Sequence, residues 1–172
     1  LKSVDWITSP DGLGISPKRI TVSTAGIAKM IRKLADDEVK FNLALSLHAA
    51  DDAKRNEIMP INEHNNLEAL TNALDYFYQK TKNRITFEYI AFRNFNDSLQ
   101  DAANLVKICR KIPARVNIIE YNPIDNAVFE KAEETVIDRF AQHLRDNRVA
   151  VTVRKSRGKD IDAACGQLAN KQ

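Results

Sequence analysis

The sequence predicts an α/β fold, an incomplete TIM-type barrel of parallel strands with outer helices. Two observations lead to this prediction. Short runs rich in β-branched and aromatic residues alternate with amphipathic stretches of helical period, which is typical of parallel strands joined by crossover helices. The chain has 172 residues, whereas a complete eight-unit barrel typically takes about 250, so only part of a barrel fits.

Four amphipathic helices are expected because apolar residues recur at intervals of three and four. The third has the clearest start, since Ser98 is a typical N-cap residue and Asp101 follows three residues later. It runs to Lys111, and Pro113 follows soon after its end. The four apolar stripes are Ile27, Met30, Ile31 and Leu34; Leu67, Leu70, Leu74, Phe77 and Tyr78; Ala102, Leu105, Val106 and Cys109; and Val136, Ile137, Phe140 and Leu144.

Five short strands are expected between the helices, at residues 20–24, 41–47, 85–90, 116–121 and 149–153. Polar residues alternate with apolar ones in several of them, for example at Ser23, Ser46 and Glu88. A parallel strand covered on both faces is normally almost entirely aliphatic, so this polar face needs a reason. Two interpretations remain open: a barrel-like sheet with a polar interior that holds a ligand, and an ordinary open α/β sheet whose polar face is partly solvated.

Composition indicates one folded domain over residues 1–172. Hydrophobic residues make up 44% and charged residues 28%, which excludes disordered and fibrous classes. The net charge of +3 permits an RNA partner without requiring one. No apolar run approaches the roughly 20 residues of a membrane span, and two cysteines form no disulfide framework, so a cytoplasmic location without membrane contact is expected. The first residue is Leu1 rather than Met, which suggests a chain processed or cut from something longer.

Active sites of parallel α/β folds lie at the carboxyl ends of the strands. The small polar residues Ser23, Ser46 and Asn122 lie at such ends and suit a ribose, an amino acid group or a base edge. His48 follows the second strand, where a histidine is more often structural than catalytic. Glu88 could order a ligand or be a satisfied buried carboxylate, and both interpretations stay open.

The two cysteines have different surroundings. Cys109 lies on the apolar side of a helix, where a small core residue is expected, whereas Cys165 lies between small residues and is a candidate nucleophile. No Cys-x-x-Cys pair or histidine cluster is present, so no metal site is expected. The segment 154–172 carries Cys165 and a cluster of cations that suits RNA phosphates, although a solvated basic face is the simpler alternative: Arg154, Lys155, Arg157 and Lys159.

Four motifs in this order resemble the C-terminal half of the RlmN and Cfr family of radical S-adenosylmethionine RNA methyltransferases. They are Thr21-Val22-Ser23-Thr24-Ala25-Gly26, Ser46-Leu47-His48-Ala49, Tyr121-Asn122-Pro123 and Asp160-Ile161-Asp162-Ala163-Ala164-Cys165-Gly166-Gln167-Leu168. Arg157-Gly158 ahead of the last motif is more similar to RlmN members. The resemblance implies methylation of carbon 2 of an adenosine in 23S rRNA, and of some tRNAs. It also implies that Cys165 carries the methyl group, while Ser23, Ser46, Leu47, His48 and Asn122 contact S-adenosylmethionine.

The resemblance further implies a [4Fe-4S] cluster and an external electron donor. The family holds its cluster with Cys-x-x-x-Cys-x-x-Cys, and this motif is absent from the chain. The chain is therefore expected to be the C-terminal part of such an enzyme and to be inactive alone. Without the first strands, it should expose a sheet edge near residues 20–24, and such an edge favours self-association.

Two other interpretations remain. A non-catalytic RNA-binding module would use the basic cluster without any cofactor, and replacing Cys165 by alanine would then leave its function intact. An unrelated partial-barrel enzyme that binds a phosphorylated metabolite would explain the polar strand ends but not the motif around Cys165.

Overall fold

A single parallel sheet forms the centre of the molecule. The computed structural model describes residues 2–123 and 128–155, and the sheet contains five strands in the order β1-β2-β3-β4-β5. Each strand pairs with the next strand of the chain, in parallel, throughout. The strands are β1 (Thr21–Thr24), β2 (Asn42–Ser46), β3 (Ile85–Ala91), β4 (Ala114–Glu120) and β5 (Val151–Arg154).

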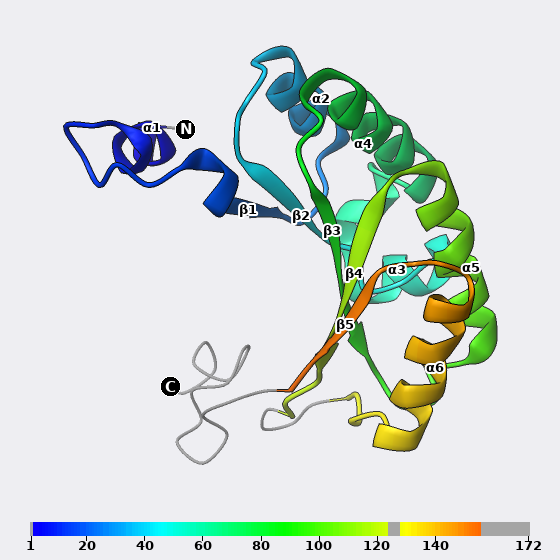
Figure 1. The fold of residues 1–172 in the computed structure, drawn as a ribbon. Coiled ribbons are helices and arrows are strands. Elements are labelled where there is room, and N and C mark those ends of the chain that lie inside the picture. The colour runs from blue at the N-terminus through cyan, green and yellow to red at the C-terminus, as the bar shows by residue number, and fades with distance from the viewer. Residues whose placement is uncertain (1, 124–127, 156–172) are drawn as a thin grey trace.

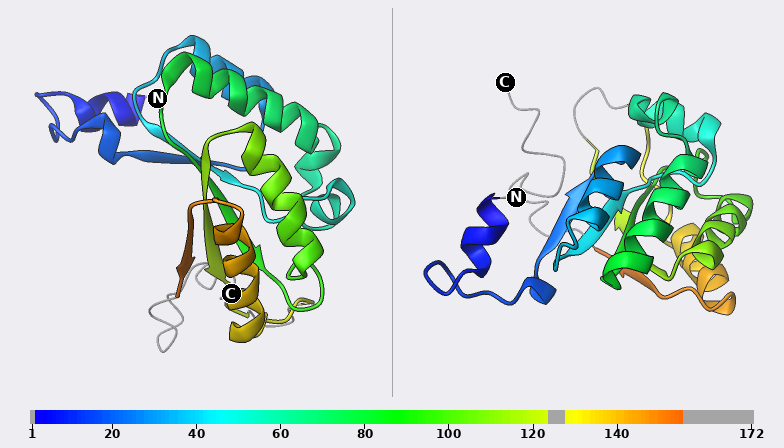
Figure 2. Two further views of the ribbon diagram at one scale, coloured as in Figure 1. Left: turned by 45° about the vertical axis from the view of Figure 1, so that its right-hand side comes forward. Right: turned by 90° about the horizontal axis from the view of Figure 1, so that it is seen from above.

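Five of the helices cover one face of this sheet, and the sheet curves around its uncovered face (Figures 1 and 2). An open sheet with helices on both faces reverses its strand order at some point, whereas this order never reverses. The prediction of a partial barrel with outer helices is therefore confirmed. The helices of the layer are α2 (Ala28–Asp36), α3 (Asp52–Ile58), α4 (Leu67–Thr81), α5 (Leu99–Lys111) and α6 (Glu134–Asp146).

The two faces of the sheet have opposite chemistry. In-register residues of parallel strands point to the same side, so Leu45 and Phe87 share the helix-covered face, where both are buried. On the other face Ser46, Glu88 and Asn117 occupy one level and form a polar row across three strands. The alternation seen in the sequence thus separates an apolar core from a polar concave face.

The start of α5 confirms the predicted helix cap. Ser98 Oγ accepts a hydrogen bond from the Asp101 N–H at 3.2 Å, and the Asp101 carboxylate accepts one from the Ser98 N–H at 3.2 Å. This reciprocal pair satisfies two N–H groups that the helix itself cannot satisfy. The same carboxylate pairs with Lys54 Nζ of α3 at 2.6 Å, which ties two helices together.

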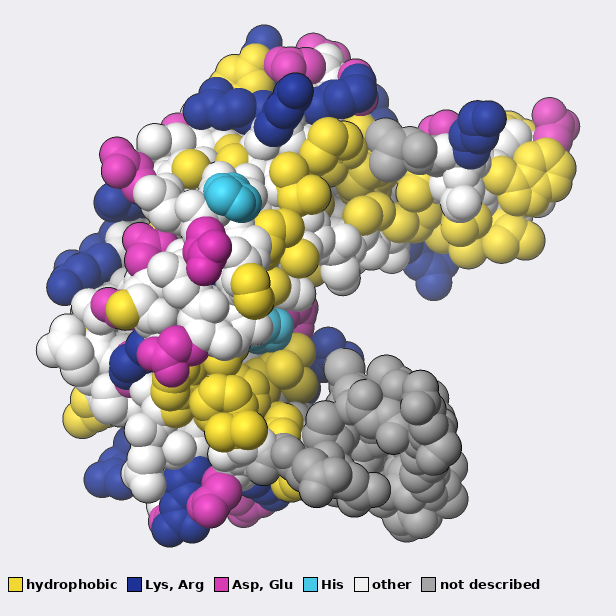
Figure 3. All heavy atoms as spheres, turned by 180° about the vertical axis from the view of Figure 1, so that it is seen from behind, with side chains coloured by type: hydrophobic (Ala, Val, Ile, Leu, Met, Phe, Trp, Pro, Cys, Tyr) yellow, Lys and Arg dark blue, Asp and Glu magenta, His cyan; other side chains and the backbone are white. Residues whose placement is uncertain are grey.

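The first segment of the chain forms an arm apart from the helical layer. Helix α1 (Lys2–Thr8) and a 3₁₀ turn (Pro17–Arg19) precede β1, and neither was expected from periodicity. The arm carries hydrophobic side chains on its surface, among them Trp6 and Leu13, which are 62% and 67% exposed (Figure 3). Among the described residues, no helix is long and apolar enough to cross a membrane.

Candidate functional site

The chain makes a tight bend directly after β2, where Ser46, Leu47 and His48 follow one another. The N–H groups of Leu47 and His48 both donate to the Glu88 carbonyl oxygen, at 3.0 and 3.2 Å. His48 has a φ of 55°, a left-handed conformation that non-glycine residues adopt infrequently. The bend therefore lifts these residues away from the strand direction at the carboxyl edge of the sheet.

The Arg55 side chain fixes this bend by hydrogen bonds to its backbone carbonyls. This side chain is fully buried, and it begins on α3. Nε donates to the Leu47 carbonyl at 3.1 Å, while Nη2 donates to the carbonyls of Ala25 at 2.9 Å and Ser46 at 3.2 Å. Nη1 donates to Asn62 Oδ1 at 2.6 Å. We call Arg55 and these four partners the Arg55 network.

Gly26 allows Arg55 to reach the strand ends. Its φ of 105° is rarely open to other residues, and a Cβ there would lie 3.0 Å from Leu45, 3.1 Å from Leu70 and 3.2 Å from Arg55 Nη2. Both the backbone conformation of Gly26 and its packing against the guanidinium therefore exclude a side chain.

The His48 imidazole is half-buried and neutral. Its Nδ1 accepts a hydrogen bond from the Ile90 N–H at 3.2 Å, so the ring proton is assigned to Nε2. Burial and, secondly, the positive charge of Arg55 lower the His48 pKa from 6.5 to about 4. At neutral pH the ring can therefore offer an N–H donor and an aromatic face, while its Nδ1 is engaged by the backbone.

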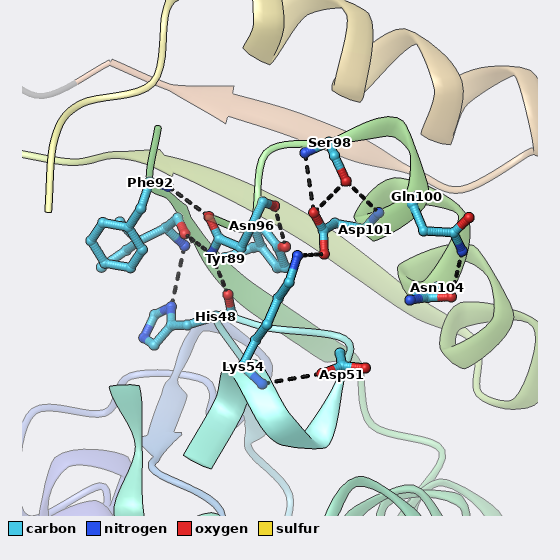
Figure 4. A network of polar contacts seen from close by, with 11 residues as sticks. His48, Asp51, Lys54, Tyr89, Phe92, Asn96, Ser98, Gln100, Asp101 and Asn104 are labelled. Carbon is cyan, nitrogen blue, oxygen red and sulfur yellow. Dashed lines mark hydrogen bonds and ion pairs between the residues drawn. The ribbon is translucent and has the colours of Figure 1, made fainter. Parts of the chain in front are cut away.

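A second set of buried hydrogen bonds lies on the other side of His48 (Figure 4). Asn96 is fully buried, and its Nδ2 donates to the carbonyls of His48 at 2.6 Å and Ile90 at 2.8 Å. Its Oδ1 accepts from the Phe92 N–H at 2.7 Å, and its backbone carbonyl accepts from the Tyr89 hydroxyl at 2.6 Å. We call this group the Asn96 network. It fixes the far side of the bend to β3.

A polar hollow of about 400 Å³ lies on the concave face below the strand ends. Glu88 is the single carboxylate among its lining residues, where its Oε1 accepts from Asn117 Nδ2 at 2.9 Å and its Oε2 is 3.9 Å from Arg154 Nη1. Within the described part of the chain, Glu88 Oε2 is buried without a hydrogen-bond partner. Glu88 is thus only half satisfied. The lining residues are Thr21, Ser23, Ala44, Arg84, Thr86, Glu88, Arg115, Asn117, Thr152 and Arg154.

Of the other residues singled out in the sequence, some lie at the carboxyl edge of the sheet, Cys109 lies on α5, and others lie outside the described residues. Asn122 follows β4 and is buried. Arg154 and Lys155 end the described chain with side chains 60% and 78% exposed, Lys155 lying 3.5 Å from Glu134. Cys109 packs against the core as expected, and burial raises the pKa of its thiol to about 12. Arg157, Lys159 and Cys165 lie outside the described residues.

Residues 2–123 and 128–155 contain no set of side chains that could bind a metal ion. No group of three or more histidine, cysteine or acidic side chains there is arranged to hold a metal ion. The chain's two cysteines could not supply the three-cysteine motif of a cluster either. The residues present therefore do not fit a [4Fe-4S] cluster.

Comparison with known proteins identifies the relationship. No family model matches the chain. A probable dual-specificity RNA methyltransferase RlmN of Christiangramia forsetii is 56% identical over 171 residues, which cover 99% of this chain and 49% of that protein. The chain is homologous to about half of an RlmN protein. The RlmN relative of Cytophaga hutchinsonii is likewise 56% identical, over the whole chain and 47% of its own length.

Solved structures agree with this relationship. A radical SAM methyltransferase from Sphaerobacter thermophilus superimposes with a TM-score of 0.89 at 38% identity, covering 94% of this chain and 47% of that one. A domain of a pyruvate-formate lyase-activating enzyme from Bacteroides vulgatus shares the fold with a TM-score of 0.61, at 11% identity. That match covers 78% of this chain and 80% of the domain. The chain thus spans about half the length of the RlmN relatives.

Sequence reasoning missed the two residues that organise the site. Each bonds one backbone carbonyl far away in the chain, Arg55 that of Ala25 and Asn96 that of His48, and no periodicity encodes such contacts. One indirect signal existed for Arg55: the stretch 52–58 has no apolar stripe, so a helix there must be anchored by a polar side chain.

Proposed function

We propose that this chain forms the part of an RNA methyltransferase that holds S-adenosylmethionine and carries the methyl-accepting Cys165. The observation that carries the proposal is the identity of 50–56% to RlmN relatives over essentially the whole chain. Under this proposal the substrate is an adenosine of 23S rRNA, methylated at carbon 2, with tRNA as a second substrate. The names of the relatives, dual-specificity RNA methyltransferases, support two kinds of RNA.

The described residues fit S-adenosylmethionine as a ligand. The cofactor carries ribose hydroxyls and an ammonium group that need acceptors, and a carboxylate that needs donors. Glu88 Oε2 is an acceptor without a hydrogen-bond partner among the described residues, although Arg154 Nη1 lies 3.9 Å away, and the hollow adds hydroxyl groups and arginines. We infer that Ser23, Ser46, Leu47, His48 and Asn122 bind the cofactor at this edge of the sheet, where parallel α/β folds place their ligands.

Cys165 needs a cofactor of this kind for its proposed role. S-adenosylmethionine supplies a methyl group activated by the positive charge on its sulfur. With the cofactor bound and its own proton given up to solvent, the Cys165 sulfur would accept that methyl group, and the electron pair of the broken carbon–sulfur bond would stay on the departing thioether sulfur.

The experiment is a graft in which this chain replaces the matching half of the C. forsetii relative. The graft should transfer a labelled methyl group to 23S rRNA and tRNA and produce 2-methyladenosine, detected by mass spectrometry of digested RNA. Replacing Cys165 by alanine should abolish the product, while Cys109→Ala, the matched cysteine control, should keep it. The 172-residue chain alone should give none.

The result could overturn the proposal in two ways. If the graft folds and binds RNA but never methylates it, the chain lacks the proposed role. If Cys165→Ala retains full activity, the methyl route through that cysteine is wrong. The alternative of a non-catalytic RNA-binding module is not favoured by the relatives, which are named as methyltransferases.

We further infer that Arg154, Lys155, Arg157 and Lys159 contact RNA phosphates. The high exposure of Arg154 and Lys155 supports this. Changing both to glutamine should weaken RNA binding and lower the slope of log affinity against log salt by about 0.7 to 0.9 per lost contact. An unchanged salt slope would mean that these two side chains touch no phosphate.

Self-association through β1 also remains a proposal. β1 is an edge strand that pairs only with β2 within the described sheet, and Thr21 and Ser23 are exposed. Unpaired strand edges favour pairing with another chain. Sedimentation of the 172-residue chain should reveal a concentration-dependent dimer, and a strictly monomeric chain would contradict this.

A further inference from the structure

The largest fully buried side chain of the described molecule is a cation, Arg55. A buried guanidinium loses its hydration, so it needs compensation from the protein. Here the compensation is the ends of two strands, since the three carbonyls of Ala25, Ser46 and Leu47 all accept from it. Burying this charge is unfavourable in free energy, so its presence indicates that the position of those carbonyls matters.

We propose that Arg55 is a positioning residue that fixes the ends of β1 and β2 so that their side chains can bind S-adenosylmethionine. This inference rests on the proposed function. The last paired residues of the two strands are Thr24 and Leu45, and beyond them no ladder hydrogen bond joins β1 to β2. Arg55 Nη2 takes over there, because it bonds Ala25 of one strand end and Ser46 of the other.

Only arginine can make these contacts together. Its planar guanidinium presents five donors in a fixed fork, and here Nε, Nη1 and Nη2 all donate to different groups. A lysine at this position would keep the charge but bring one nitrogen in place of three. Replacing Arg55 by lysine therefore keeps the positive charge but removes the hydrogen-bonding geometry, so the two effects can be measured separately.

The Asp52 carboxylate balances the positive charge of Arg55 indirectly, through the Asn62 side chain that lies between them. Asn62 is buried, accepts from Arg55 Nη1 and donates from its Nδ2 to the Asp52 carboxylate at 2.9 Å. Asp52 in turn accepts from the Leu67 N–H at 2.9 Å, at the start of α4. Arg55 thus bonds the strand ends on one side and, through Asn62 and Asp52, the start of α4 on the other. These contacts give the strand ends one defined position.

The experiment compares Arg55→Lys and Arg55→Met in the graft described above, with Arg110→Lys and Arg110→Met as matched controls. Arg110 is exposed, and its Nη2 donates to Asn147 Oδ1 at 3.0 Å, at the opposite edge of the sheet. Because a displacement of about 1 Å at a site can reduce function about 100-fold, we expect Arg55→Lys to raise the dissociation constant for S-adenosylmethionine by about 10- to 100-fold. Affinity is measured only on the fraction that remains folded by near-ultraviolet circular dichroism.

The His48 imidazole, followed by NMR in the 172-residue chain, reports the charge separately. Arg55→Met should raise the His48 pKa, whereas Arg55→Lys should leave it close to its original value. A purely structural Arg55 would lower the folded fraction but leave cofactor affinity of the folded molecules unchanged, and this would overturn the inference. If Arg55→Met does not fold, the cofactor affinity of the folded Arg55→Lys protein still tests the positioning role.

Failure of the proposed function looks different. In that case the graft with Arg55 intact binds no S-adenosylmethionine at all. If that graft binds the cofactor and the folded Arg55→Lys graft binds it equally well, the proposed function stands and the positioning role of Arg55 is wrong.

Discussion

The two sides of the bend after β2 are held by different chemistry. On one side the Arg55 network uses a buried cation, and on the other the Asn96 network uses a neutral amide. Both side chains are fully buried, and each bonds a backbone carbonyl beyond the end of a strand, Arg55 that of Ala25 and Asn96 that of His48. Only the cation changes its surroundings electrostatically, since Arg55 contributes to the low pKa of His48. Backbone carbonyls can thus be held in place by a charged or by a neutral side chain, and only the charged one here affects the pKa of His48.

Helix α3 contacts both the strand ends and the start of α5 through consecutive residues. Arg55 points to the strand ends, whereas Lys54 pairs with Asp101 at the start of α5, where Ser98 caps the helix (Figure 4). Asp51 begins the helix by accepting from the Lys54 N–H at 3.1 Å. A helix of seven residues without an apolar stripe is therefore fixed by polar contacts at both of its sides.

The largest effect should come from removing the cation. Arg55→Met leaves the carbonyls of Ala25, Ser46 and Leu47 buried without their donor, and each such loss costs about 1 kcal/mol or more, so we expect the free energy of unfolding to fall by about 3 kcal/mol. Urea denaturation measures it, with Arg110→Met as the exposed control. A loss below about 1 kcal/mol would mean that the charge costs as much as its bonds contribute.

The neutral network should be weaker by comparison. Asn96→Ala removes the donor to two carbonyls and the acceptor for the Phe92 N–H, and we expect it to lower the free energy of unfolding by about 2 kcal/mol. Asn104, whose side chain bonds only surface residues in the described structure, provides the matched control Asn104→Ala. If Asn96→Ala costs more than Arg55→Met, the order of the two networks is reversed.

A pH titration tests the lowered pKa of His48, which burial causes first and the charge of Arg55 second. The His48 pKa is about 4 in the folded chain and 6.5 in its ordinary state, so between these values the unfolded chain binds more protons. The free energy of unfolding should then fall as pH drops from 6.5 towards 4, with a slope from this group of at most about 1.4 kcal/mol per pH unit. His48→Asn, which tolerates a positive φ, should remove this contribution. Identical slopes in both proteins would contradict it.

The smallest effect should be at the helix cap. Ser98→Ala removes the acceptor for the Asp101 N–H but leaves the ion pair of Asp101 with Lys54, so we expect a loss of about 1 kcal/mol in the free energy of unfolding. Ser3→Ala, on the exposed face of α1, serves as the control. A loss above about 2 kcal/mol would indicate that Ser98 also maintains the Asn96 network.

The regular part of the fold was predictable because its signals are local. All five strands appear within two residues of their predicted bounds, since β-branched runs and period-two alternation depend on neighbouring residues. The start of β5 shows the limit of this. Val149 was expected in the strand, but its N–H donates to the Leu144 carbonyl at 3.0 Å and ends α6 instead.

The site was only partly predictable. The strand ends carrying Ser23, Ser46 and Asn122 follow from the parallel fold, whereas the side chains that shape them depend on distant partners. Arg55 bonds Ala25, 30 residues earlier, and Asn96 bonds His48, 48 residues earlier. Helix α3 escaped prediction for the same reason, because its anchor is a single arginine rather than a stripe.

The sequential strand order also bears on how the molecule forms. Each strand finds its partner in the strand just before it, so a growing chain can add one strand and one helix at a time to a sheet that already exists. Contacts between neighbouring segments close shorter loops than contacts between distant ones and form faster. During synthesis, β2 can dock on β1 before β5 has left the ribosome, so the described sheet can grow strand by strand from β1 towards β5.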